Sequence, residues 1–248
     1  MKYQLLTMSN SKVNKKAQEL GYFPAVLHLA PAKASGYQVC AMAKMAGCIE
    51  VCLNTAGRGG IAKDRAVHSP HGVEVPDNAI QAARIRRTRL LFEEVAVFWK
   101  SLISDITQLE YEARTLGLKA CVRLNGTSDL RWESMAFEGR TILERFPKLQ
   151  FYDYTKLLNR RSIPANYDLT ISYSTAKPYD KNCIAAARSQ GRRIAAVWRG
   201  TQPDFLHGFP TVSGDDHDLR FLDPLDSCCA LTAKGRARKQ DSALIVDC

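Results

Sequence analysis

Three cysteines lie close together near the amino-terminal end of this chain. Cys40, Cys48 and Cys52 fall within one glycine-rich stretch, GYQVCAMAKMAGCIEVCLNTAGRGG. Thiolates bind soft metal centres, and three of them on one loop suit a [4Fe-4S] cluster whose fourth iron stays open to a substrate or cofactor. The glycines allow the backbone to bend around such a bulky group. The sequence therefore predicts an iron–sulfur cluster with these three cysteines as its ligands.

Zinc is the alternative metal for this loop. A structural zinc ion needs a closed shell of four ligands, and the fourth could be His68, His71, Cys228 or Cys229. A disulfide framework is disfavoured, because the chain begins MKYQLLTMSNSKVNKK without an apolar signal-peptide core and its eight cysteines are irregularly spaced. We expect a reduced, cytoplasmic compartment.

Composition limits the classes of protein and of partner. The 248 residues are 46% hydrophobic, and no run approaches the length of about 18 apolar residues that a membrane span needs. We expect one domain over residues 1–248 and no membrane partner. The net charge is +10, from 35 Lys and Arg against 25 Asp and Glu, which favours small anionic ligands or nucleic acid. Aromatic residues interleaved with basic ones, typical of single-strand binding, are not evident.

Short apolar runs alternate with helical stretches along the chain, a pattern typical of a parallel α/β sheet or barrel. We predict a partial (β/α)6 TIM-like barrel with the metal-cluster loop directly after its first strand. The predicted strands are 24–30, 118–124, 149–154, 167–174, 192–198 and 228–233, and the predicted helices are 77–117, as one bent helix or two, 134–146, 157–161 and 181–191.

Polar residues follow the predicted strands at their carboxyl ends. In parallel α/β folds these loops converge on one mouth, where ligands bind. On this basis Asp129, Asp153 and Lys156 are the candidate catalytic residues. The candidate cofactor-binding residues are Arg87, Asn125, Ser128, Tyr154 and Ser172.

Two of these candidates also have simpler interpretations. The amine of Lys156 could hold a carboxylate or act as a nucleophile if desolvated, or it could begin an ordinary helix face. Asp129 could move protons beside the metal, or it could cap a helix amino terminus.

A cysteine loop after the first strand of a partial barrel resembles the radical S-adenosylmethionine fold. That resemblance implies S-adenosylmethionine as a possible ligand of the open iron. In that superfamily the cysteines are separated by three and then two residues, whereas seven and three residues separate them in this chain. The different spacing leaves the cluster prediction in place and puts S-adenosylmethionine binding in question.

A second resemblance extends over residues 33–245. The segments CLNTAGRG, RIRRTRLLF, VRLNGTSDLRWE, FYDYTK, NYDLTISYS, SGDDHDLRFLDP and LTAKGRARK together are similar to the phage gene product 88-like family. The resemblance implies a phage protein, acting in the cytoplasm of an infected cell, with a cysteine-ligated cluster. It supplies no reaction.

Two classes of function follow from these observations. The first is a phage-encoded [4Fe-4S] enzyme that binds a small anionic substrate or cofactor at the open iron, for radical or Lewis-acid chemistry. The second is a non-enzymatic module in which a cluster or zinc is structural or redox-sensing and the basic surface binds nucleic acid or a host protein.

Overall fold

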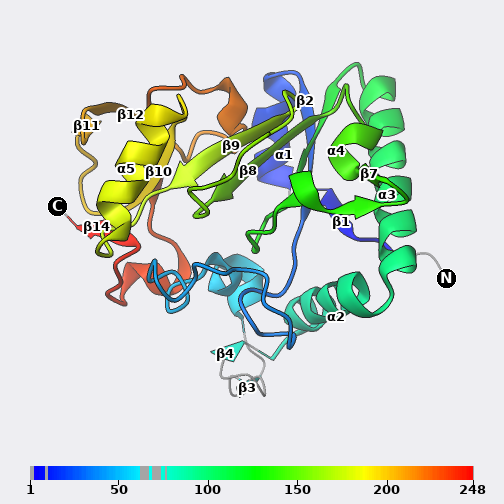
Figure 1. The fold of residues 1–248 in the computed structure, drawn as a ribbon, viewed down its shortest axis with the longest axis horizontal. Coiled ribbons are helices and arrows are strands. Elements are labelled where there is room, and N and C mark those ends of the chain that lie inside the picture. Colours follow the sequence, from blue (N-terminus) through cyan, green and yellow to red (C-terminus); the bar gives the residue numbers. More distant parts are fainter. Residues whose placement is uncertain (1–2, 9–10, 62–66, 69–73, 76, 248) are drawn as a thin grey trace.

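A computed structural model describes residues 3–8, 11–61, 67–68, 74–75 and 77–247 of the chain. It is an α/β fold built on one ten-stranded, mostly parallel sheet (Figure 1). The strands, in sheet order, are β1 (Leu6–Met8), β2 (Tyr22–Leu27), β5 (Lys119–Arg123), β8 (Gln150–Thr155), β9 (Tyr167–Ser172), β10 (Ile194–Arg199), β13 (Cys228–Thr232), β12 (Phe209–Ser213) and β11 (Phe205–Leu206), with β14 (Ile245–Asp247) paired to β10.

All six predicted strands are present, and they lie side by side in chain order as β2, β5, β8, β9, β10 and β13. Each pairs in parallel with the next. The regularity follows from the sequence, since each run is apolar, rich in β-branched or aromatic residues and bounded by polar or turn residues. Their carboxyl ends therefore share one edge of the sheet, as predicted.

The predicted barrel is not found: within the described residues the sheet is open. An antiparallel strand, β1, ends it on one side, and the antiparallel hairpin of β11 and β12 ends it on the other. The connections from β8 to β9 and from β10 to β13 contain no α-helix, so the repeating strand–helix unit that would curve the sheet into a barrel is incomplete. The likeness to the radical S-adenosylmethionine barrel has no support in this topology.

The helices are α1 (Ser11–Glu19), α2 (Ala79–Glu93), α3 (Val95–Thr115), α4 (Ile142–Arg145) and α5 (Tyr179–Ser189). The predicted helix over 77–117 is two helices that meet at Glu94. The side chain of Asn78 caps the first of them by accepting the Ile80 and Gln81 amides, each at 3.0 Å. The prediction for 181–191 is confirmed as α5, which begins two residues earlier.

Two predicted helices are wrong. Within 134–146, residues 136–141 form a hairpin of β6 (Ala136–Phe137) and β7 (Arg140–Thr141), because Glu138 and Gly139 turn the chain with φ values of 50° and 74°. Only α4 remains helical, capped by Thr141 and Glu144. Residues 157–161 form no helix, and Arg160 within them is buried in an ion pair with Glu133. A further hairpin joins β3 (Val67–His68) and β4 (Glu74–Val75).

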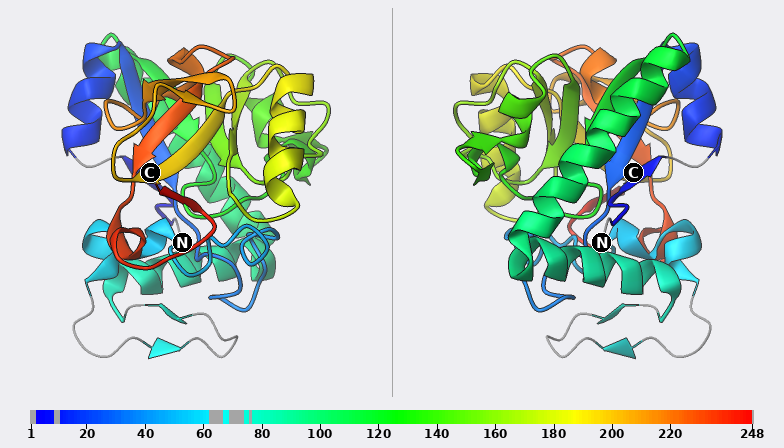
Figure 2. Two further views of the ribbon diagram at one scale, coloured as in Figure 1. Left: turned by 90° about the vertical axis from the view of Figure 1, so that its left-hand side faces the viewer. Right: turned by 90° about the vertical axis from the view of Figure 1, so that its right-hand side faces the viewer.

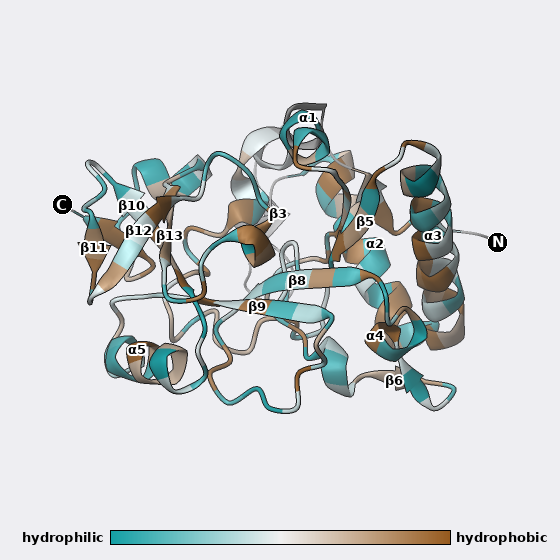
Figure 3. Cartoon of the chain, turned by 90° about the horizontal axis from the view of Figure 1, so that it is seen from above, coloured by the Kyte–Doolittle hydropathy of each residue, from teal (hydrophilic) through white to brown (hydrophobic). Residues whose placement is uncertain are grey.

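Helices and loops cover the two faces of the sheet differently (Figures 2 and 3). On one face, α3 packs Phe98, Trp99 and Leu102 against β2, β5 and β8, and α5 packs Cys183 and Ala187 against β10 and β13. On the other face, α1 and the 217–221 segment cover Cys121 and Tyr152. Figure 3 shows both hydrophobic and hydrophilic residues along α3, as expected for a helix with one buried face. In the described residues, no helix has the length and apolarity to cross a membrane.

Trp132 tests this core. Its indole is fully buried, and its Nε1 donates to Asn125 Oδ1 at 3.1 Å. Trp132→Ala should lower the free energy of unfolding by about 3–5 kcal/mol, because it leaves a large cavity and removes one hydrogen bond to Asn125 Oδ1. Urea denaturation measures the change. Leu116→Ala, at a side chain that is 57% exposed, should cost no more than about 0.5 kcal/mol; equal losses in the two variants would contradict the packing described.

Candidate functional site

The cysteine loop lies against the carboxyl-end edge of the sheet, between α2 and the carboxy-terminal segment (Figures 1 and 2). Three contacts attach it there. The Asp129 amide donates to Val39 O at 2.7 Å, Ser174 Oγ donates to Ala46 O at 2.9 Å, and Ser242 Oγ donates to Gly47 O. Gly47 has a φ of 68°, and an added Cβ would lie 2.8 Å from Ser242 Oγ, so this attachment requires glycine.

The three predicted cysteine ligands are neighbours in the folded chain. Burial raises the pKa of each thiol, that of Cys52 to about 11, and the negative charge of one thiolate raises the pKa of another: Cys48 and Cys52 both act on Cys40. None of the three forms a disulfide. Cys40 Sγ lies 3.7 Å from Thr127 O, and Cys48 Sγ lies 3.4 Å from Ala43 O. The loop therefore gathers three free thiols beside the end of β5.

Two buried cations lie close to these thiols. Arg84 of α2 is 8% exposed and donates to Asn54 O at 3.2 Å, and Lys156, which follows β8, is also 8% exposed. Both lower the pKa of Cys52, and Lys156 lowers that of Cys48. The pKa of Lys156 is itself lowered by burial, which the nearby thiolate of Cys48 partly offsets. Any negative charge among the cysteines is therefore stabilised by fixed positive charge.

The first turns of α2 hold the loop that follows Cys52. Gln81 Nε2 donates to Asn54 O and to Gly59 O, each at 2.8 Å, and Asn78 Nδ2 donates to Gly59 O at 3.1 Å. The turn is so tight that a Cβ on Gly60 would lie 1.8 Å from a backbone oxygen. Glycine after the cysteines thus allows two backbone segments of this turn to pack closely against each other.

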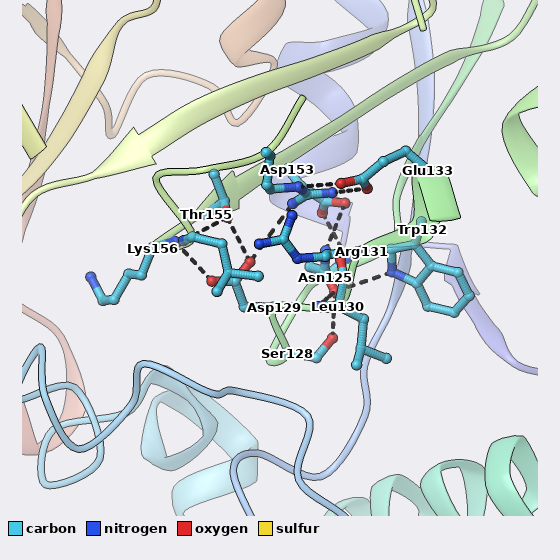
Figure 4. A network of polar contacts seen from close by, with 12 residues as sticks. Asn125, Ser128, Asp129, Leu130, Arg131, Trp132, Glu133, Asp153, Thr155 and Lys156 are labelled. Carbon is cyan, nitrogen blue, oxygen red and sulfur yellow. Dashed lines mark hydrogen bonds and ion pairs between the residues drawn. The ribbon is translucent and has the colours of Figure 1, made fainter. Parts of the chain in front are cut away.

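Asn125 organises the loop after β5 (Figure 4). Its Oδ1 accepts from Ser128 Oγ at 2.8 Å, from the Leu130 amide at 2.9 Å and from Trp132 Nε1 at 3.1 Å. The backbone amide of Asn125 donates to Asp153 Oδ1 at 2.7 Å. The candidate cofactor-binding residues Asn125 and Ser128 therefore use their polar atoms to shape this loop.

The candidate catalytic carboxylates are also engaged within the protein (Figure 4). Asp129 accepts from Thr155 Oγ1 and from the Lys156 amide, both at 2.8 Å. Asp153 is fully buried and accepts from Tyr167 OH at 2.7 Å. Burial raises the pKa of Asp153 to about 7. Of the two, Asp129 lies near enough to the cysteines to raise the pKa of Cys40 and Cys48.

Lys156 and Ser172 come together beside the thiols, as the shared strand edge predicted. Lys156 Nζ donates to Ser172 Oγ at 2.7 Å and lies 3.4 Å from Ser172 O. The ammonium has three donors. The ionisable groups near enough to raise its pKa by their negative charge are those of Cys48, Asp129, Cys183 and Cys40. Of all the candidates from the strand ends, this pair has the chemistry of an anion-binding group.

Tyr154 and Arg87 lie elsewhere. Side chains alternate along β8, so Tyr154 points to the opposite face from Asp153, where its ring stacks 4.6 Å from the Arg123 guanidinium and its hydroxyl donates to Asp218 at 3.4 Å. Arg87 is half-buried on α2, and its charge acts on His28, whose pKa is lowered to about 3 chiefly by burial. The structure does not bring these two residues to the cysteines.

Sequence reasoning missed two residues at the site, Tyr179 and Cys183. Tyr179 OH donates to Ser172 O at 2.9 Å, and Cys183 lies near Lys156. Both lie in α5 directly after the β9 loop, four residues apart and therefore on one helix face. Their place after a strand carboxyl end was the available signal; the apolar surroundings of Cys183 instead indicated an ordinary core residue.

The structure places none of the candidate fourth metal ligands beside the three loop cysteines within the described residues. Cys228 and Cys229 are fully buried in β13, and their electrostatic neighbours do not include the three loop cysteines. His71 and the side chain of His68 lie outside the described residues. Among the residues described, no group of three His, Cys, Asp or Glu side chains is arranged to hold one metal ion. A [4Fe-4S] cluster makes a different demand, because each cysteine binds a different iron.

The family is decided by comparison with known proteins. The model of the family described as Gene product 88 matches residues 4–248. The chain belongs to this phage family. No curated protein and no solved structure matches it. Membership confirms the resemblance found in the sequence motifs and extends it over nearly the whole chain, including the cysteine loop and every strand of the sheet.

Asp153 provides a test of the buried network. Its folded pKa of about 7 exceeds the ordinary value of 3.8, so between these values the folded protein binds a proton that the unfolded chain does not. This group's contribution to stability is therefore fully present below about pH 4 and is lost as pH rises through about 7. Asp153→Asn cannot ionise, so its unfolding free energy should fall less over this range than that of the unmodified protein. Urea titrations at several pH values measure both slopes; identical slopes would contradict the pKa.

Proposed function

We propose that this protein binds a [4Fe-4S] cluster through Cys40, Cys48 and Cys52 and binds a small anionic substrate or cofactor beside it, at Lys156. The observation that carries the proposal is the meeting of three free thiols from one loop with two buried cations, Arg84 and Lys156. Three sulfur donors from one loop suit the soft irons of such a cluster and leave its fourth iron open, whereas a structural zinc ion needs a fourth protein ligand.

Charge supports the assignment. A cubane cluster with three thiolate ligands is net negative, and a buried negative group needs compensation. Arg84 and Lys156 supply it from two different elements, α2 and the end of β8. Binding of the metal would also remove the thiol protons, which the burial of these cysteines otherwise retains.

Lys156 supports the second half of the proposal. Its ammonium is buried, and its direct hydrogen-bond partners are the neutral oxygens of Ser172. The nearby carboxylate of Asp129 is occupied by Thr155 and by the Lys156 amide. A carboxylate or phosphate on a bound molecule would give this ammonium a negatively charged hydrogen-bond acceptor in addition to the neutral oxygens of Ser172.

An open iron supplies a Lewis acid or an electron to a molecule bound beside it. The residues of the protein would bind and orient that molecule: Lys156 and Ser172 would hold its anionic group. S-adenosylmethionine carries such a carboxylate. In its more specific form, the proposal is that this compound is the ligand and that the reaction is radical chemistry. The position of the cysteine loop, after the first parallel strand, is the feature that favours it.

The metal site is tested by metal analysis. Protein reconstituted without oxygen should hold about four iron and four sulfide per chain and absorb visible light. Cys40→Ser, Cys48→Ser and Cys52→Ser should each lose most of the iron. Cys121→Ala, at a buried cysteine on the other sheet face, should retain it. A colourless protein with one zinc, or equal iron in all four variants, would overturn the proposal.

The ligand site is tested on cluster-loaded protein. S-adenosylmethionine and, separately, citrate are added, and the electron paramagnetic resonance spectrum of the reduced cluster is recorded. Lys156→Gln should keep its iron but require about tenfold more of the effective compound to change the spectrum, since one charge-assisted hydrogen bond is lost. Lys148→Gln, at an exposed lysine before β8, is the control. Equal responses of the two variants would remove Lys156 from the site.

A further inference from the structure

A second concentration of positive charge lies away from the cysteines. It lines a surface hollow of about 590 Å³ between the chain that follows β8 and the carboxy-terminal end of α5. Three arginines contribute to it: Arg160 and Arg161 from the first segment, and Arg192 from the turn before β10. The remaining lining residues are Leu158, Asn159, Ala186, Ser189 and Gln190.

Two of these arginine side chains have no hydrogen-bond or ion-pair partner in the part of the chain that the structure describes. Among the described residues, the guanidinium of neither Arg161 nor Arg192 takes part in a hydrogen bond or an ion pair, whereas that of Arg160 donates to Glu133 through Nε at 2.9 Å. The other nearby carboxylate, Asp168, is paired with Arg193 at 2.5 Å. The hollow therefore has two guanidinium groups with no dedicated counter-charge.

The end of α5 does not supply that counter-charge. Helix carbonyls at a carboxyl terminus attract cations, but here they already accept other donors. Ala186 O accepts from the Gln190 amide and from Ser189 Oγ, and Ala187 O accepts from the Arg192 amide. Gln190 Nε2 donates across the hollow to Leu158 O at 2.8 Å, which fixes its two sides relative to each other. The arginines thus lie around a preformed cavity.

Holding Arg192 in this position has a cost without an anion. Its guanidinium is partly buried, and its pKa is lowered first by that burial and then by the charge of Arg160, a shift that the charges of Asp168 and Glu133 only partly oppose. An oxyanion in the hollow would offset the burial cost and the repulsion from Arg160, and it would accept from the planar donors of Arg161 and Arg192, which match phosphate geometry.

We propose that this hollow is a binding site for a phosphate group, held by Arg161 and Arg192. The site is distinct from the cysteine loop and does not depend on a cluster being present. The phosphate could belong to a free small anion or to the backbone of a nucleic acid, both of which the net charge of +10 favours.

Two probes separate these sources. Inorganic phosphate binding is measured by calorimetry, and binding of a short single-stranded DNA oligonucleotide by fluorescence anisotropy, both at low salt. The variant Arg161→Gln/Arg192→Gln is compared with Arg86→Gln/Arg140→Gln, which removes the same charge at two exposed arginines of α2 and β7. All four positions lie near or at the surface, so circular dichroism should show that both variants fold.

The hollow variant should bind at least one probe about tenfold or more weakly than the control variant, as expected when charge-assisted hydrogen bonds are lost. A defect with inorganic phosphate alone identifies a small anion as the ligand, and a defect with the oligonucleotide identifies a nucleic-acid backbone. Equal affinities of the two variants for both probes, or no binding of either probe to the unmodified protein, would overturn the proposal.

Discussion

Asp129 is the residue through which the parts of the candidate site are joined. Its amide binds Val39 O of the cysteine loop, and its carboxylate binds the Lys156 amide at the end of β8. One residue thereby fixes the loop, the end of β5 and the end of β8 relative to one another. A buried carboxylate without donors would be costly, so the side chain of Asp129 requires the donors at the end of β8. Asp129 thereby links the loop that carries the thiols to the strand end that carries Lys156.

Most candidate polar residues prove to be part of the scaffold that surrounds the thiols. Asn125 folds the loop after β5, Asp153 anchors Asn125, and Arg160 ties the segment after β8 to Glu133. Such a network keeps buried polar atoms satisfied. The residues that remain for the proposed site are the three cysteines, Lys156 and Ser172.

The two proposed sites use positive charge in different ways. At the cysteine loop, Lys156 and Arg84 are buried and held by neutral oxygens, so they form a rigid environment suited to a small, enclosed group. At the hollow, the side chains of Arg161 and Arg192 have no hydrogen-bond or ion-pair partner among the described residues and remain accessible to solvent. That arrangement suits an anion that binds and leaves at the surface.

The sequence by itself determined the six parallel strands, the helices α2, α3 and α5, and the grouping of the three cysteines. These are local properties: apolar runs, caps and close spacing express themselves within a few residues. Its error at 134–146 was also local in origin, because a turn at Glu138 and Gly139 interrupts a stretch with helical spacing.

Only the tertiary structure decided that the sheet stays open and that Arg84 and Lys156 meet the thiols. It also decided that Tyr154 faces away from the thiols, and it alone brought Arg161 beside Arg192. Each of these depends on which distant strands and helices pack together, and the side-chain pattern within one segment does not specify the face that another segment will cover.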